Sequence, residues 1–337
     1  MRTAAGLSLL FVLFAAWGLT APAANSSARG FLLVANKGDH TLGIVDPETG
    51  RQIATVAESG VTGHETAASP DGKTGYVPIY GNSGVGAAGS DGRTLDVVDL
   101  ATRRVVATID FGRPTRPHGA VFGPRDGMLY VTTELSNTID VIDPRTNKII
   151  AQIPTGQPES HMLAITSDGT RGYTSNVHAG TVSAIDLVAR KVIAVIPVSE
   201  HAQRIALSVD DRYAFTADQT KPQLAVIDTT ANKVKTWVPL SALAYGTAPT
   251  LDGKWLLVTL PSAGQVAVVD LNSMQVVRTV DVPRSPQEIL VRPDNQVAYV
   301  SCHESRKVAA INLETWKADK IIEAGPMADG LAWARAD

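Results

Sequence analysis

Residues 138–156, TIDVIDPRTNKIIAQIPTG, contain the pattern that decides the fold. An apolar run ends in Asp143, a polar turn follows, and a second apolar run begins after Lys148. Apolar and polar side chains alternate along both runs, as they do in β-strands that bury one face. The stretch is therefore predicted to form two antiparallel strands joined by a turn, and the aspartate is expected to cap that turn.

The same pattern recurs along the chain, and a polar residue ends the first apolar run of each copy. These anchor residues are Asp46, Asp99, Asp143, Asp186, Asp228, Asp270 and Asn312. Successive anchors are 53, 44, 43, 42, 42 and 42 residues apart. Two further strands are expected before each anchor, as in HGAVFGP (118–124) and GMLYVTT (127–133). Four short strands in about 42 residues are typical of a propeller blade, so we predict an all-β, seven-bladed β-propeller of four-stranded antiparallel blades.

The two ends of the repeat are expected to meet. The first copy has only three strands, whereas ADGLAWARAD (328–337) aligns with the first strand of the other copies. We predict that this last strand joins the N-terminal blade and closes the ring, so that no sheet edge is left open between the two ends. The propeller is expected to cover residues 31–337.

The first residues have the features of a signal peptide. Arg2 precedes an apolar run, and the small-residue sequence APA follows at 21–23. We therefore expect a signal peptide at 1–23, a short linker at 24–30, and a periplasmic or secreted protein. The apolar run is short for a membrane span and no later segment is long enough, so no membrane span is expected.

Composition narrows the range of partners. The net charge is −3 and no basic run is present, which argues against nucleic acid as a partner. Cys302 is the only cysteine, so no internal disulfide can form, and its thiol is expected to be buried packing. We expect a monomer.

Three short motifs resemble the YVTN family of β-propeller repeat proteins. They are YVTTE (130–134), YTSN (173–176) and YVSCH (299–303), each followed by the repeated anchor pattern. The resemblance implies a propeller fold over nearly the whole chain. It says little about activity, because the family includes surface-layer proteins, periplasmic binding proteins and propellers associated with enzymes.

One residue in each blade is expected at the top mouth of the central channel. The top face is the one that carries the loops between blades and the loops between the second and third strands of each blade. Counting six residues back from each first hairpin turn gives His64, His118, His161, Gln203, Tyr245, Gln287 and Asp329. Residues two positions earlier include Arg116, Glu159 and His201, which are candidates for a second layer. The acidic residues expected near the histidines are Glu65, Glu134 and Glu159.

Two kinds of site fit this polar ring. A water-filled mouth could bind a small molecule or a protein at the top face, and this is the interpretation we favour. Alternatively, His64, His118 and His161 could hold a Cu, Zn or Fe ion, because three imidazoles with an open position suit a catalytic metal. That arrangement would fit a metal-dependent oxidoreductase and, less well, a lactonase-like hydrolase. A third hypothesis is a surface or scaffold protein that uses its outer rim.

One loop departs from the repeat. The segment IYGNSGVGAAGSDGRT (79–94) carries about ten extra residues, mostly Gly, Ala and Ser. Extra length in a single loop usually accompanies function or disorder. Residues 80–93 are expected to fold over the channel mouth beside His64.

Overall fold

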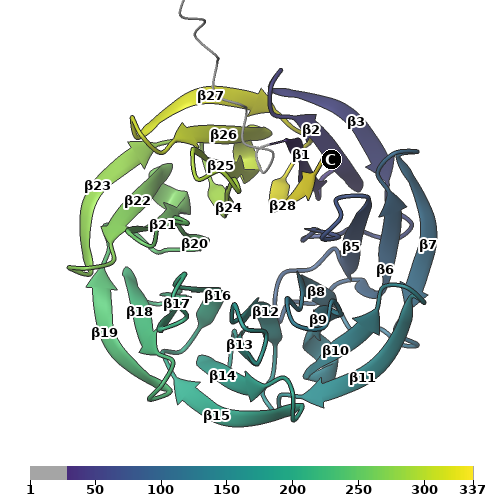
Figure 1. Ribbon diagram of the computed structural model, residues 1–337, viewed down its shortest axis with the longest axis horizontal. Helices are drawn as coiled ribbons and strands as arrows, with labels where there is room; N and C mark the ends of the chain where they lie inside the picture. Colours follow the sequence, from purple (N-terminus) through teal and green to yellow (C-terminus); the bar gives the residue numbers. More distant parts are fainter. Residues whose placement is uncertain (1–28, 337) are drawn as a thin grey trace, which may run out of the picture.

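A computed structural model describes residues 29–336 (Figure 1). Seven four-stranded sheets form a closed ring around a central axis, and all strand pairs within the sheets are antiparallel. The prediction of an all-β, seven-bladed propeller is confirmed. The expected signal peptide at 1–23 lies outside the described residues. None of the helices in residues 29–336 has the length and apolarity that crossing a membrane requires.

The strands of each blade follow one another outward from the channel. Blade 1 contains β28 (Ala328–Arg335), β1 (Gly30–Asn36), β2 (Thr41–Asp46) and β3 (Arg51–Ala57). Blade 2 contains β4 (Ala67–Ala68), β5 (Thr74–Gly81), β6 (Asp91–Asp99) and β7 (Arg104–Asp110). Blade 3 contains β8 (Pro117–Phe122), β9 (Leu129–Thr133), β10 (Thr138–Asp143) and β11 (Lys148–Pro154). Blade 4 contains β12 (Ser160–Ile165), β13 (Arg171–Asn176), β14 (Thr181–Asp186) and β15 (Lys191–Pro197).

The remaining blades repeat this order. Blade 5 contains β16 (Ala202–Leu207), β17 (Tyr213–Asp218), β18 (Gln223–Asp228) and β19 (Lys233–Pro239). Blade 6 contains β20 (Thr247–Pro249), β21 (Trp255–Leu260), β22 (Gln265–Asp270) and β23 (Gln275–Asp281). Blade 7 contains β24 (Pro286–Val291), β25 (Val297–Cys302), β26 (Lys307–Asn312) and β27 (Lys317–Glu323). Three short 3-10 helices, Glu134–Ser136, Pro261–Ala263 and His303–Ser305, follow β9, β21 and β25.

The last strand closes the ring as expected. β28 pairs with β1, with Leu32 opposite Trp333 and Leu33 opposite Ala332. Figure 1 shows the two strands side by side, although they come from opposite ends of the chain. β1 begins at Gly30, which is one residue before the expected start of the propeller.

The repeated anchor residues cap the turns between the third and fourth strands. The Asp143 carboxylate accepts a hydrogen bond from the Arg145 backbone N–H at 2.9 Å. Asp228 accepts one from the Ala231 N–H at 2.8 Å, and the Asn312 side chain accepts one from the Glu314 N–H at 2.9 Å. Because each anchor satisfies backbone donors of its own turn, the repeat of Asp is a consequence of turn geometry.

A bulge in the innermost strand sets which side chains enter the channel. In blade 3, Pro117 faces Thr133 and Ala120 faces Val131, so His118 and Gly119 together oppose one residue. Register shifts of the same kind occur in β12, β16, β24 and β28. Bulges redirect the side chains of the strand that carries the extra residue. The expected ring positions lie at or next to these bulges.

A hydroxyl group of the neighbouring strand completes the hydrogen bonding at the bulge. Thr132, the third residue of the YVTTE motif, accepts a hydrogen bond from the Gly119 N–H at 2.9 Å. Its hydroxyl also donates to the His161 carbonyl at 2.6 Å, which joins blade 3 to blade 4. Thr259 makes the corresponding pair of bonds, from the Gly246 N–H and to the Gln287 carbonyl. The hydroxyl of this motif therefore supports the channel wall.

We expect Leu331→Ala to lower the free energy of unfolding by about 2–4 kcal/mol, because it leaves a cavity under the closing strand. Leu331 is 7% exposed and packs with Leu32 and Ile322. Urea denaturation followed by tryptophan fluorescence measures the change. Val277→Ala on β23, where the side chain is 46% exposed, is the control and should change stability by less than about 0.5 kcal/mol. Equal effects of the two substitutions would show that β28 adds little to the closed ring.

Candidate functional site

The structure brings the three histidines of the predicted ring together. His64 lies just before β4, and His118 and His161 are the second residues of β8 and β12. All three side chains are buried. The rings of His118 and His161 stack with centroids 3.7 Å apart, and His64 meets the edge of His118 at 5.7 Å. Side chains from three consecutive blades thus form one cluster, as their equivalent positions in the repeat predict.

The imidazoles of this cluster are neutral at physiological pH. Burial lowers the pKa of His64 to about 3 and holds the pKa of His118 well below its usual value. Burial also lowers the pKa of His161, although Glu134 acts in the opposite direction. The His64 Nε2 atom lies 3.0 Å from the Gly81 carbonyl and so carries the proton. A neutral imidazole keeps one nitrogen lone pair, which makes it a potential ligand for a metal.

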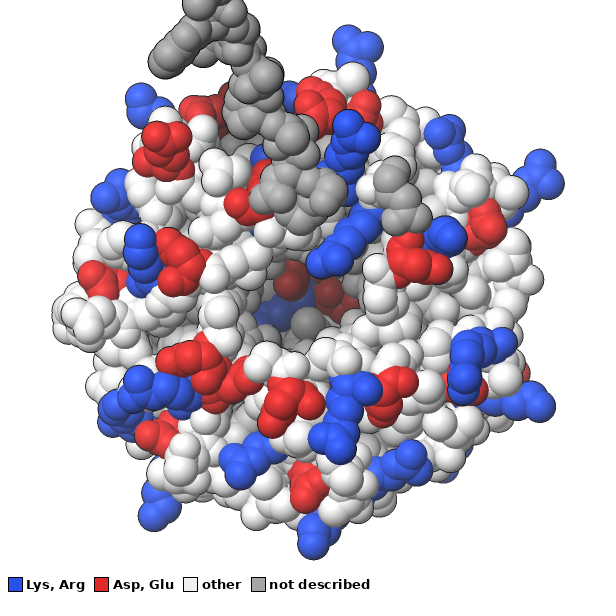
Figure 2. Space-filling view, in the orientation of Figure 1, with Lys and Arg blue, Asp and Glu red and all other residues white. Residues whose placement is uncertain are grey.

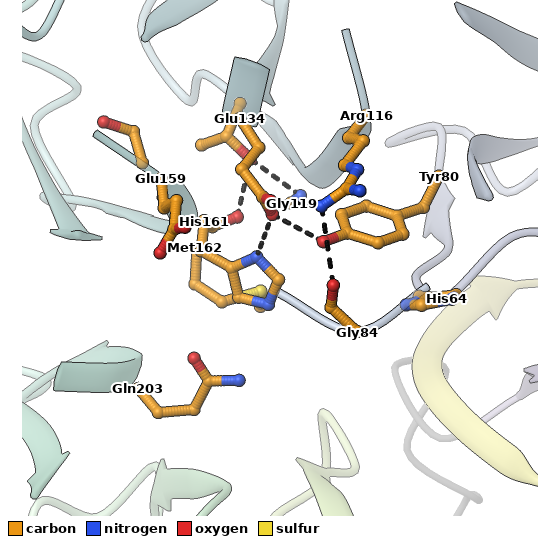
Figure 3. Close-up of polar contacts among 12 residues, drawn as sticks. His64, Tyr80, Gly84, Arg116, Gly119, Glu134, Glu159, His161, Met162 and Gln203 are labelled. Carbon is orange, nitrogen blue, oxygen red and sulfur yellow. Dashed lines mark hydrogen bonds and ion pairs between the residues drawn. The ribbon is translucent and has the colours of Figure 1, made fainter. Parts of the chain in front are cut away.

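Glu134 fixes the orientation of His161. It begins the 3-10 helix after β9 and is 1% exposed. Its Oε2 atom accepts hydrogen bonds from the Tyr80 hydroxyl at 2.7 Å and from His161 Nδ1 at 3.2 Å (Figure 3). Its Oε1 atom lies 3.2 Å from Arg116 Nη1. Burial disfavours the charged carboxylate, but these partners outweigh burial and lower the pKa of Glu134.

Arg116 links this cluster to the Gly-rich loop. Its guanidinium pairs with Asp91 at 2.7 Å and donates to the Ala87 carbonyl at 2.6 Å. Its backbone has a φ of +49°, which directs the side chain from the blade 3 loop back toward blade 2. Arg116, one of the predicted second-layer residues, therefore holds the middle and the C-terminal end of the inserted segment.

The Gly-rich loop reaches across to blade 4. A Cβ atom on Gly86 would lie 2.5 Å from the His178 ring and 2.8 Å from the Glu159 carboxylate, so the loop backbone packs directly against these side chains, and its φ of +66° favours glycine. Glu159, a second predicted second-layer residue, contacts Nδ1 of His178. His201 is the third predicted second-layer residue, and its ring meets the His178 ring edge-on with centroids 4.6 Å apart. The loop therefore packs against the second-layer residues Arg116 and Glu159 on blades 3 and 4.

The other predicted ring members do not join the histidines. Gln203 donates a hydrogen bond to the Tyr245 hydroxyl at 3.1 Å. Gln287 contacts Ser285 of its own blade at 3.2 Å. Figure 3 shows Gln203 apart from Glu134 and the other labelled residues, with no drawn contact between them. The ring thus divides into a histidine part on blades 2–4 and a second part on the remaining blades.

Arg204 is the centre of that second part. It follows Gln203 in β16, has a φ of +60° and is 2% exposed. Its guanidinium pairs with Glu65 at 2.6 Å, with Asp329 at 3.1 Å and with Glu288. It also lies 4.9 Å from the centre of the Tyr245 ring. One side chain of blade 5 therefore contacts residues from blades 1, 2, 6 and 7. Figure 2 shows charged side chains inside the central hollow.

Burial and the neighbouring cations act in opposite directions on the pKa values of the carboxyl groups around Arg204. Burial raises the pKa of Glu65 and of Glu288, although Arg204 opposes this effect in both cases. Asp329 is buried too, yet Lys37 and Arg204 lower its pKa to about 2. Lys37 lies 3.1 Å from that carboxylate. Asp329 therefore lies between two cations, Lys37 and Arg204.

Sequence reasoning missed Arg204 and Tyr80. Arg204 lies one position after a predicted ring residue, and the bulge turns its side chain into the channel. The sequence did contain a signal for Arg204, because it is a charged residue inside the otherwise mostly apolar strand AQRIAL. The equivalent position in β8 is Gly119. Tyr80 ends the last apolar stretch before the Gly-rich loop. Nothing in the pattern showed that its hydroxyl would reach blade 3.

The histidine cluster does not have the geometry of a metal site as it stands. Within residues 29–336, no group of three or more His, Cys, Asp or Glu side chains is arranged to hold an ion. The stacked rings of His118 and His161 cover each other's faces. However, the Nδ1 atom of His118 is buried and has no hydrogen-bond partner among the described residues.

Comparison with known proteins supports a β-propeller. Residues 122–250 match the family model of the Cytochrome D1 heme domain. The matched segment is less than half of the chain. Hydrazine synthase of Kuenenia stuttgartiensis matches with a TM-score of 0.74 and 22% identity, covering 85% of this chain and 93% of that one. A functionally unknown protein from Desulfotomaculum acetoxidans DSM 771 matches with a TM-score of 0.76 and 17% identity, covering 91% of this chain and 100% of that one.

At these identities the two structures show the fold alone. No curated protein sequence matches the chain. The narrower resemblance to YVTN repeats rests on the sequence motifs.

Arg204→Met is expected to lower the free energy of unfolding by about 3–5 kcal/mol, because it leaves buried carboxylates without their cation. Denaturant unfolding at neutral pH measures the loss. Arg145→Met is the control, since the Arg145 side chain is 80% exposed beside Asp143 and its removal should cost less than about 1 kcal/mol. A loss below about 1 kcal/mol for Arg204→Met would contradict a central role for this guanidinium.

Glu58 should make stability fall as the pH rises. Its carboxylate accepts the Gly63 N–H at 2.8 Å, just before His64, and burial raises its pKa from 4.5 to about 7. The folded state then holds a proton that the unfolded state loses near pH 4.5. This stabilisation is full below that pH and is lost as the pH rises through about 7.

Between pH 5 and pH 8, the free energy of unfolding of the wild type should fall by about 2–3 kcal/mol more than that of Glu58→Gln, because the amide does not titrate. Chemical denaturation at both pH values measures this difference. Glu48→Gln, at an exposed position, should follow the wild type. A parallel pH dependence of the Glu58 variant and the wild type would show that Glu58 is not the group responsible.

Proposed function

We propose that the protein binds a ligand at the histidine cluster of its channel, and that this ligand carries a first-row transition metal. The observation that carries the proposal is His118 Nδ1, a buried imidazole nitrogen without a hydrogen-bond partner among the described residues. Leaving a buried polar atom unpaired costs about 1–3 kcal/mol. An unpaired buried group of this kind calls for a partner such as an ion, a ligand or a water molecule.

The donor chemistry of the cluster fits a metal. His161 donates its Nδ1–H to Glu134, which leaves Nε2 free for another partner. Histidines that bind metals generally donate their other ring N–H to a carboxylate or a carbonyl. His64 donates to the Gly81 carbonyl in the same way. Imidazole nitrogens suit Cu, Zn and Fe, and a bound ion would require the stacked rings to rotate apart.

The family match supports a heme-like form of this ligand. The matched segment, 122–250, contains both Glu134 and His161. The heme of that family's description is an iron-bearing macrocycle, and within the matched segment His161 is the member of the histidine cluster whose Nε2 could face it, whereas His64 and His118 lie outside that segment. Burial of the histidines under the Gly-rich loop would exclude water from such a group.

The second candidate function is an oxidoreductase at the same site. The family description favours it over the hydrolase alternative, since heme iron supplies electron transfer. In this chain, Glu134 would orient His161, and Arg116 would keep the loop closed through Asp91 and Ala87. Export through the segment 1–23 belongs to the same proposal.

Metal binding can be tested with protein purified without a histidine tag. Titration with hemin, and separately with Cu²⁺ and Zn²⁺, is followed by absorbance and by calorimetry. We expect at least one of these to bind in a one-to-one ratio, and His118→Gln to weaken that binding at least about tenfold. His40→Gln is the control, because His40 is exposed in a loop of blade 1 and should leave the affinity unchanged.

Failure of all three probes to bind, or equal affinities of the His118 variant and the wild type, would overturn the proposal. Thermal unfolding of the variants shows whether the fold is intact. If a metal binds, a reversible oxidation and reduction of the loaded protein would favour the oxidoreductase. A loaded protein with no such behaviour would favour binding alone.

A further inference from the structure

A cavity of about 720 Å³ lies between blades 5 and 6, on the face opposite the histidine cluster. The first hairpin turns of both blades line it, together with the turn after β22. Equivalent cavities occur between blades 4 and 5 and between blades 6 and 7, but their volumes are about 250 and 270 Å³. The position between blades 5 and 6 is therefore enlarged in this ring.

A side chain that bridges the turns in the two neighbouring gaps is missing between blades 5 and 6. Between blades 4 and 5, the Asp211 carboxylate accepts the Ser167 N–H at 2.8 Å. Between blades 6 and 7, the Asn295 side chain accepts the Leu251 N–H at 2.7 Å. The repeat places Gly253 at the equivalent position between blades 5 and 6, where no side chain can bridge the turns.

The space at Gly253 is open. A Cβ atom built there would meet no heavy atom within 4 Å, and its φ is +70°. Asp211 and Asn295 adopt the same left-handed conformation, with φ values of 59° and 58°. Asn and Asp tolerate this conformation better than other side chains. Glycine is thus not required by the local backbone, and its presence keeps the cavity open.

The cavity presents cationic groups beside an aromatic ring. Lys235 Nζ lies 2.6 Å from the Tyr213 hydroxyl and 4.6 Å from the centre of its ring. The Arg212 guanidinium lies 5.5 Å from the same ring. No carboxylate among the described residues lies within ion-pair distance of Lys235, and the Arg212 contact with Asp210 is long, at 4.0 Å. Both cations can therefore meet an anion from solution.

Each of the two carboxylates in the lining has its Oδ1 atom bound within its own turn. Asp210 accepts hydrogen bonds from the Ser208 hydroxyl at 2.6 Å and from the Arg212 N–H at 3.2 Å. Asp252 accepts them from the Thr250 hydroxyl at 2.6 Å and from the Lys254 N–H at 3.1 Å. The lining thus holds two acidic and two basic side chains, and Lys235 is the one of the two cations without a carboxylate within ion-pair distance among the described residues.

Apolar side chains form the rest of the lining. Val209 and Leu251 are each 45% exposed, and Leu271 and Met274 contribute further apolar surface. Ligand cavities of several hundred cubic ångströms hold small organic molecules when a few polar groups fix their orientation.

We propose that this cavity binds a small organic anion with an apolar body, such as an aryl-alkyl carboxylate. The carboxylate would lie at Lys235 and Arg212, and the apolar body would lie along Val209 and Leu251. The site is separate from the histidine cluster, so this inference stands or falls independently of the proposed function.

The test compares 4-phenylbutyrate with its uncharged amide, using the complete chain and ligand-detected NMR or calorimetry. We expect the acid to bind at least about fivefold more tightly than the amide, because only the acid can pair with the cations. Lys235→Met should weaken binding of the acid at least about fivefold. Thermal unfolding checks that each variant is folded.

The decisive variant is Gly253→Asn, which supplies the side chain found at the equivalent position of blade 7. It is expected to fold and to weaken binding of the acid at least about tenfold, because the new side chain bridges to the Val209 turn and narrows the cavity toward the volume found between blades 6 and 7. Gly127→Asn is the matched control. Gly127 has the same place in blade 3, a φ of +68° and no atom within 4 Å of an added Cβ, so binding should be unchanged.

Three outcomes would overturn the proposal. They are no binding of the acid at millimolar concentration, equal binding of acid and amide, and binding by folded Gly253→Asn that equals the wild type. If Gly253→Asn does not fold, the Lys235 variant and the amide comparison still decide the question.

Discussion

The guanidinium of Arg204 is the contact on which the centre of the ring depends. Burying a charge is costly, and the cost is offset only when partners of opposite charge surround it. Here the partners are Glu65, Glu288 and Asp329, each from a different blade. Because the partners come from three blades, the ion pairs form only when the ring is closed. The same guanidinium also contacts the Met162 sulfur, one residue after His161, so the ion-pair cluster lies against the histidine cluster.

The same backbone feature, a β-bulge in the innermost strand, directs side chains into both parts of the channel. The bulge in the innermost strand presents His118 in blade 3, and in blade 5 it presents Arg204. Hydroxyl groups such as that of Thr132 satisfy the backbone at the bulge and connect neighbouring blades. The backbone is therefore common to the blades, and the chemistry of each sector is decided by which residue occupies the redirected position.

The architecture could be predicted from the sequence because the repeat length and the alternation of apolar and polar residues follow directly from the strands and turns of each blade. The sequence anticipated the closing strand, the turn-capping role of anchors such as Asp143, and the meeting of three histidines. It did not anticipate Arg204, because counting from a turn assigns residues to a position but does not show the direction that a bulge gives the side chain. The stacking of His118 on His161 depends on rotamers and on partners such as Glu134, which no periodicity describes.

Closure by β28 also governs how this chain can fold. Leu33 and Ala332 pair although roughly 300 residues separate them, and pairings of such high sequence separation form slowly. Blade 1 lacks its innermost strand until the last residues of the propeller are present, whereas blades 2–7 are each built from contiguous sequence. An intermediate with six complete sheets and one exposed edge is therefore built into the topology. The lifetime of that species sets the interval during which the chain is open to aggregation.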